Sequence, residues 1–242
     1  MLINGCKIME TDSLYFDLHV HSIYSHDSTM KPETIIKHSL KRGLSGVAIT
    51  DHNTIQGAIA TDYISNDDFI IIIGAEIITE KGEIIGLFLN EEIKSNDFYN
   101  VIDEIKGQGG LIIFPHPFKK GVKNQELLVK EVDMIEVLNA RIKPEMNNKA
   151  CLLAEEFNLP ITAGSDAHTF FEIGNVRNRL PIDELCIEEI RKTLIGGSNI
   201  PIGRESPLYI RMLSKGIGRY NKDGVSGLVN SIHKVIKNGF LS

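Results

Sequence analysis

Apolar and polar positions divide most of the chain into two kinds of segment. Short, nearly continuous apolar runs rich in β-branched residues are typical of buried strands. Such runs occupy residues 13–20, 45–51, 67–77, 84–89, 109–117, 132–139 and 159–166. Stretches of helical character lie between them at residues 31–43, 97–110, 124–132 and 145–158. Apolar strands that alternate with helices predict parallel strands and right-handed crossovers, in a barrel or a doubly wound sheet.

The end of the chain follows a different pattern. Residues 225–236 place apolar side chains on one helical stripe, which predicts a helix that caps the core. The preceding residues, 203–221, give mixed signals and predict no definite element. A chain of 242 residues with 42% hydrophobic content can form a large core, and α/β barrels reach this length as one domain. We therefore expect one domain, 1–242, with a barrel core at about 15–200 and a helical extension at about 201–242.

Charge limits the classes of partner. The chain has 26 Lys and Arg against 32 Asp and Glu, a formal net charge of -6, which argues against generic binding to nucleic acid or acidic membranes. Residues 204–242 are nevertheless basic, and we interpret them as the solvated face of a packed helix, with contact to a phosphorylated partner as the alternative. We expect a small phosphorylated substrate, no membrane and no stable nucleic-acid complex.

The cysteines and the hydropathy of the chain indicate the cellular compartment in which we expect the protein. Cys6, Cys151 and Cys186 are too far apart for a CxxC zinc site, and their odd number suits a reducing compartment. The sequence contains neither a recognisable signal peptide nor a run of 18 apolar residues. These features predict a cytoplasmic protein.

Side chains that can bind metals follow the predicted strands. The first strand is followed by His19, His21 and Asp27, the second by His52, and the third by Glu76 and then Glu83; His116, Asp166 and His168 follow later strands. With His26, six of the eight histidines lie at such ends. Because barrel and open-sheet enzymes place their chemistry at the carboxyl ends of strands, this placement predicts a single site.

The types of these residues predict metals and a reaction. His19 and His21 are two residues apart, so on a strand they project to the same side. Imidazole with carboxylate suits Zn, Mn or Fe, and nine donors suffice for two or three divalent ions. Two ions about 3.5–4 Å apart activate a shared water and stabilise both oxygens of an in-line displacement. The set therefore indicates hydrolysis of a phosphoester. We interpret Asp17 and Asp51, which precede ligand histidines, as residues that orient an imidazole.

Five ordered segments carry a family resemblance. DLHVHSIYSHDS, GVAITDHNT, GAEI, FPHP and GSDAH, between about Tyr15 and Leu180, resemble the polymerase and histidinol phosphatase (PHP) family of metal-dependent phosphoesterases, and in particular its small stand-alone members. The resemblance implies a distorted (β/α)₇ barrel, here with the C-terminal helical extension. It also implies up to three metals at the carboxyl ends of the strands, and a hydroxide between two of them as the nucleophile.

The same resemblance implies a role for each ligand. His19 and His21 would hold a first metal together with Asp166, and Glu76 would bridge it to a second metal that His116 also holds. Asp27, His52 and His168 would hold the third. The implied catalytic residues are Glu76, Asp166 and His168.

Two positions leave alternatives open. Related proteins often have a histidine in the strand after the bridging glutamate, whereas this chain has Glu83. Glu83 either keeps the second site, favouring a harder ion such as Mn or Mg, or turns away and weakens it. In the segment YSHDS, Asp27 is the simplest ligand, with His26 as its competitor.

Basic side chains near these segments are candidates for binding the substrate phosphate. They are Lys119 (with its neighbour Lys120), Arg141 and Arg177. Two other classes of protein remain as alternatives. An amidohydrolase barrel also begins with an HxH pair, and a non-catalytic metal-binding regulatory module could have the same fold. The intact ligand set favours the phosphoesterase, while the natural substrate stays open.

Overall fold

The computed structural model describes residues 13–65, 68–214, 216–220 and 223–224 of the chain. Its strands are β1 (Leu14–Val20), β2 (Gly46–Ile49), β3 (Ile70–Thr79), β4 (Gly82–Leu87), β5 (Leu111–Phe114), β6 (Met134–Asn139), β7 (Ile161–Gly164), β8 (Val176–Leu180) and β9 (Ile200–Gly203). Its helices are α1 (Pro32–Lys41), α2 (Gln56–Asp62), α3 (Phe98–Gly107), α4 (Gln125–Leu128), α5 (Pro144–Phe157) and α6 (Ile187–Ile195), with a 3₁₀ turn η1 (Val129–Glu131). All seven strands predicted from the apolar runs are present.

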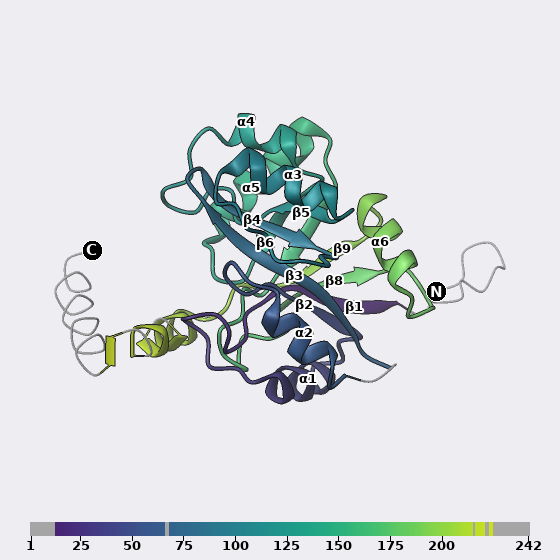
Figure 1. The fold of residues 1–242 in the computed structure, drawn as a ribbon, viewed down its shortest axis with the longest axis vertical. Coiled ribbons are helices and arrows are strands. Elements are labelled where there is room, and N and C mark those ends of the chain that lie inside the picture. The colour runs from purple at the N-terminus through teal and green to yellow at the C-terminus, as the bar shows by residue number, and fades with distance from the viewer. Residues whose placement is uncertain (1–12, 66–67, 215, 221–222, 225–242) are drawn as a thin grey trace.

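The strands form one sheet in the order β7-β6-β5-β4-β3-β2-β1-β8-β9. Strands β1 to β3 are mutually parallel, and so are β5 to β7. The sheet curls until the end of β7 meets β1: the amide of His21 donates to the carbonyl of Ala167, and the amide of Ala167 donates to that of His19. Figure 1 shows α1 and α2 on one side of the strands and α3, α4 and α5 on the other. The distorted α/β barrel is thus confirmed.

Strand β4 departs from the expected parallel pattern. It runs antiparallel to both β3 and β5. Only Glu80 and Lys81 separate it from β3, and parallel neighbours need a crossover of a dozen or more residues. Because of this hairpin, Glu83, the second residue of β4, lies at the end of the barrel where β3 ends. Glu83 lies opposite Ile78 in the ladder.

Elements that the sequence patterns did not predict are α2, α6, β8 and β9. Strand β8 runs antiparallel to β1. The side chain of Asn178 on β8 forms hydrogen bonds to the backbones of β7 and β1. Its Oδ1 accepts from the amide of Ala163 (3.0 Å), and its Nδ2 donates to the carbonyls of Ala163 (2.7 Å) and Phe16 (3.3 Å). The Asn178 amide group therefore provides hydrogen-bond partners for backbone groups of β7 and β1.

The C-terminal extension is only partly described. Residues 208–214 and 216–220 are helical, within the segment that gave mixed signals. The predicted helical stripe at residues 225–236 lies outside the described residues, as does Cys6. Cys151 and Cys186 are free thiols. Within the described ranges, no helix combines the length and apolar character that a membrane span requires.

Apolar side chains pack inside the barrel and between the strands and the surrounding helices, and this packing holds the ends of the strands in position. Phe16 and Leu18 of β1 pack with Ile72, Ile85 and Met134 in one buried cluster. A second cluster joins β5 and β6 to α3 and α5, and a third joins β1 to β3 to α1 and α2. Because interiors are packed as densely as organic crystals, the residues at the strand ends have little freedom to move.

Gly164, the last residue of β7, tests this close packing. A Cβ at Gly164 would overlap the Cβ of His19 and the carboxylate of Glu136. We expect Gly164→Ala to destabilise the fold by about 1–3 kcal/mol, as overpacked sites do. Gly107→Ala, at the end of α3, is the control because its Cβ would meet nothing within 4 Å. Urea unfolding of both variants is the measurement, and equal stability would contradict the close approach of β7 to β1.

Candidate metal centre

All nine predicted ligands lie at one end of the barrel. Each belongs to at least one group of three or four side chains whose donor atoms lie within 4.8 Å of one another. These groups are His19, His21 and Asp166; His19, Glu76 and His116; His52, Glu76 and Glu83; and His21, Asp27, His52 and His168. His26 belongs to none of them, so of the two residues left open in YSHDS, the geometry favours Asp27.

Glu76 lies at the centre of the arrangement. Its Oε1 is 3.0 Å from Nε2 of His116, and its Oε2 is 3.5 Å from Nε2 of both His19 and His21. The same Oε2 is 3.2 Å from Nδ1 of His52. The Glu76 side chain is 2% exposed. Its two oxygens therefore face different sets of imidazoles, which is the geometry of a carboxylate that bridges two ions.

A second set of donors surrounds Asp27. Its Oδ2 lies 3.0 Å from Nε2 of His168 and 3.6 Å from Nε2 of His52. Two buried atoms of this set, Oδ1 of Asp27 and Nδ1 of His52, have no hydrogen-bond partner among the described residues. Buried polar atoms are normally satisfied, so the unpaired carboxylate oxygen of Asp27 fits a cation. Nδ1 of His52 lies 3.2 Å from Oε2 of Glu76 without forming a hydrogen bond to it, which also leaves this nitrogen able to bind a metal.

The tautomers of His19 and His21 also fit a cation. Nδ1 of His19 lies 2.9 Å from Oε1 of Glu136. Nδ1 of His21 lies 3.0 Å from the hydroxyl of Ser25, which itself donates to Asp51 and so accepts from the ring. Two neutral rings with Nδ1 protonated would oppose their Nε2 lone pairs at 3.1 Å. Burial lowers the pKa of His19, but the charges of Glu136 and Glu76 raise it well above its usual value, so a proton or a metal ion can occupy the space between the two rings. A positive charge between them removes this repulsion.

The pKa values of the buried carboxylates also favour a bound cation. Burial would raise the pKa of Glu76, but the His19 charge and the contact with His116 hold it well below its usual value. Burial likewise opposes ionisation of Asp166, yet His19 and Arg141 lower the pKa of that carboxyl. Burial lowers the pKa of His52, whereas the hydrogen bond to Asp27 and the charge of Glu76 raise it to about 9. The donor set therefore holds ionised carboxylates at neutral pH.

The backbone is unusual at two candidate ligands. His116 has φ 29° and Asp166 has φ 53°, in the region that favours glycine. The His116 amide donates to Oε2 of Glu136 at 3.0 Å, and the amide that precedes Asp166, that of Ser165, donates to Asp17 at 2.9 Å. Strained residues of this kind persist where the surroundings fix them, and they concentrate at functional sites.

Glu136 is a functional candidate that the sequence interpretation missed. It is 2% exposed on β6, accepts from the amide of His116 and the side chain of Asn139, and faces the His19 ring. Its signal was a single carboxylate inside the apolar run MIEVLN. Asp17 differs from its interpretation: within the described residues its carboxylate contacts no imidazole ring and accepts from the backbone amides of His19, Ser165 and Gly174. Asp51 acts through Ser25 on His21, as interpreted.

The candidate phosphate-binding cations separate into two groups. Nζ of Lys119 lies 2.6 Å from Oε2 of Glu83, so Glu83 points toward the cluster and a cation accompanies it. Arg141 contacts the His168 ring and lies 3.8 Å from Oδ1 of Asp166. Arg177 is not brought to the cluster: it donates to the carbonyl of Arg42 and lies over the Tyr15 ring.

The chain is similar to known proteins both in sequence and in fold. A family model described as PHP-associated matches residues 144–198. Two proteins of Methanocaldococcus jannaschii, both named only as uncharacterized, are similar in sequence. MJ1587 is 40% identical over 150 residues, which are 56% of this chain and 88% of that protein. MJ0417 is 38% identical over 184 residues, which are 72% of each chain.

Solved structures of similar fold have low identity. A two-domain protein from Bacteroides vulgatus, described as containing a predicted PHP-like metal-dependent phosphoesterase, has a TM-score of 0.71 at 18% identity, over 80% of this chain and 65% of that one. The lesion-specific endonuclease PfuEndoQ from Pyrococcus furiosus has a TM-score of 0.62 at 17% identity, over 79% and 59%. An amidohydrolase from Chromobacterium violaceum, with bound sulfate, has 0.59 at 15%, over 76% and 97%.

Glu136 provides a test of the arrangement that does not depend on turnover. We expect Glu136→Gln to lower metal affinity by about 10–100-fold, because a neutral amide no longer fixes the tautomer of His19. Metal content after dialysis against graded chelator measures the effect. Glu156→Gln, an exposed position on α5, is the matched control. Wild-type affinity in Glu136→Gln would show that this carboxylate has no part in metal binding.

Proposed function

Because the chain belongs to the PHP family, we propose that it is a metal-dependent phosphoesterase that hydrolyses a phosphate monoester or diester. The observation that carries this proposal is the position of Glu76, whose two oxygens face His116 on one side and His19, His21 and His52 on the other. A carboxylate with donors on both sides is suited to join two ions, and paired ions are suited to in-line displacement at phosphorus.

The ligands of the proposed ions follow from the groups of donors. His19, His21 and Asp166 would hold one ion. His116 and Glu83, whose Oε2 lies 3.6 Å from Nε2 of His116, would hold a second, with Glu76 shared between the two ions. Asp27, His52 and His168 would hold a third. Divalent ions bound there, such as Zn, Mn or Fe, would lower the pKa of a coordinated water toward neutrality and polarise the phosphoryl oxygens.

The chain's own residues would prepare the reaction in three ways. Glu136 and the Ser25 hydroxyl, which Asp51 orients, contact the Nδ1 atoms of His19 and His21 and so direct the Nε2 atoms of both rings at the centre. Arg141, beside Asp166 and His168, supplies fixed positive charge where a phosphoryl oxygen would gain negative charge. Most of these side chains are buried, and burial in a medium of low dielectric constant strengthens their charge interactions.

The substrate is proposed only as a class. A small phosphorylated molecule, such as a sugar phosphate, a nucleotide or a short oligonucleotide, suits a cluster that two cations, Lys119 and Arg141, flank. One neighbour in fold is named as an endonuclease and another as an amidohydrolase, so the first assay includes diesters and amides beside monoesters. The proposal predicts turnover of phosphate esters and none of cyclic amides.

The first test measures hydrolysis of p-nitrophenyl phosphate and bis-p-nitrophenyl phosphate by protein of known metal content. We expect Glu76→Gln and Asp166→Asn each to reduce kcat by about 10²–10³-fold or more, because each removes a charge that organises the centre. Circular dichroism checks the fold, and Glu156→Gln is the control. Normal turnover in either variant, or cleavage of dihydroorotate in place of phosphate esters, would refute the proposal.

Glu83 provides a test of metal preference. A carboxylate favours harder ions than an imidazole does, so we expect Glu83→His to shift preference from Mn toward Zn. The variant also leaves Lys119 without its 2.6 Å partner, freeing that cation for a substrate anion. Competition between Mn and Zn, followed by metal analysis, is the measurement, with Glu83→Gln as the comparison. An unchanged ratio in both variants would place Glu83 outside the metal shell.

A further inference from the structure

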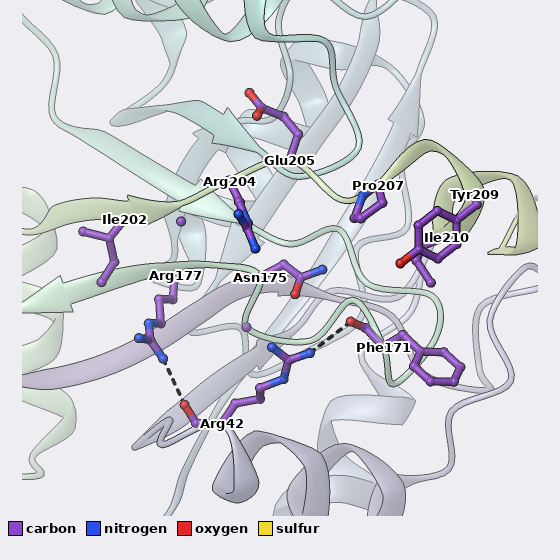
Figure 2. A pocket seen from close by; sticks show the side chains of 12 residues that line it. Arg42, Phe171, Asn175, Arg177, Ile202, Arg204, Glu205, Pro207, Tyr209 and Ile210 are labelled. Atoms are coloured by element: carbon purple, nitrogen blue, oxygen red, sulfur yellow. Dashed lines mark hydrogen bonds between the residues drawn. The ribbon is translucent and has the colours of Figure 1, made fainter.

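A second pocket lies apart from the metal cluster. It has a volume of about 650 Å³, within the range of small-molecule sites, and none of the nine candidate ligands lines it. Its walls come from the end of α1, the loop before β8, and the segment that follows β9. Arg42, Arg177 and Arg204 are among the lining residues. Figure 2 shows their guanidinium groups gathered around one space.

Hydrogen bonds hold two of these arginines in position without neutralising them. Arg42 donates to the carbonyl of Phe171 at 3.3 Å, and Arg177 donates to the carbonyl of Arg42 at 2.9 Å. Each bond uses one of the five N–H donors of a guanidinium. Within the described part of the chain, none of the three arginines forms an ion pair with a carboxylate. Most of their donors therefore remain available to a ligand.

The carboxylate that lines the pocket does not offset this charge. Nδ2 of Asn147, on α5, donates to Oε1 of Glu205 at 3.3 Å. Figure 2 shows the Glu205 carboxylate turned away from Arg42 and Arg177. Three neighbouring guanidinium groups repel one another, and an anion between them would reverse the sign of that interaction.

The other end of the pocket is aromatic and apolar. Figure 2 shows Phe171, Tyr209 and Ile210 on the side away from Arg177. Tyr209 is 70% exposed and Phe171 47% exposed, and the Phe171 ring packs against that of Phe170 with centroids 4.0 Å apart, so most of the accessible aromatic surface belongs to Tyr209. Accessible aromatic rings beside a cationic surface can stack on a planar group, as they do in nucleic-acid-binding proteins.

We propose that this pocket binds a nucleoside phosphate, with its phosphates on the arginines and its base against Tyr209 and Phe171. Guanidinium groups match phosphate oxygens in bidentate geometry, and three of them suit a ligand with more than one negative charge. The site is distinct from the metal cluster, because the lining residues and the nine candidate ligands have no member in common.

The test is calorimetric titration of the full-length protein with the methylene-bridged, non-hydrolysable analogue of ADP. Inorganic phosphate and adenosine are titrated separately as its two halves. We expect Arg204→Gln to weaken the analogue about tenfold or more, the scale of one lost charge-assisted hydrogen bond. Tyr209→Ala should weaken the analogue but leave phosphate binding unchanged, because only the base contacts that ring.

Two further variants separate this pocket from other sites. Arg191→Gln, on α6 outside the pocket, is the control for loss of a surface arginine and should bind the analogue normally. Arg141→Gln reports binding at the metal cluster. The proposal is overturned if the wild-type protein shows no saturable binding, if Arg204→Gln binds as tightly as wild type, or if affinity is lost in Arg141→Gln alone. Equal loss of phosphate and analogue binding in Tyr209→Ala would also contradict it.

Discussion

Buried carboxylates and facing imidazole nitrogens constrain the end of the barrel where the candidate ligands lie. Glu76 and Asp166 are ionised side chains at the end of the barrel, and Nε2 of His19 and of His21 face each other at 3.1 Å. Groups of this kind repel one another in a low-dielectric interior unless positive charge joins them. The set therefore makes physical sense as a cage for cations, and the rest of the fold fixes the cage.

The barrel fixes it through close packing and a second layer of hydrogen bonds. Gly164 lets β7 approach β1 at His19, and Glu136 ties the His19 ring to the His116 backbone. Asp51 acts in the same way on His21 through Ser25. Each of these residues limits the rotation or tautomer of a candidate ligand. Preorganisation of this kind lets a binding site act without large rearrangement.

Positive charge is distributed in two places with different surroundings. Lys119 and Arg141 lie against carboxylates of the cluster, whereas Arg42, Arg177 and Arg204 lie around a pocket with little compensation. The segment after β9 connects the two regions: Tyr209 lines the pocket, and the neighbouring Arg211 donates to the carbonyl of Arg141. A single segment thus contacts both an exposed anion-binding surface and the edge of the metal cluster.

The sequence by itself determined the seven strands and the identity of the nine clustered donors, because apolar periodicity and chemically distinctive residues are local signals. It did not determine the direction of β4, the strands β8 and β9, or the destination of Arg177. Those depend on a two-residue hairpin and on side-chain contacts such as that of Asn178 with Ala163. Glu136 had a visible local signal, but only tertiary structure placed it beside His19, 117 residues away in the chain. Distances between segments far apart in sequence are set by packing, which no local pattern encodes.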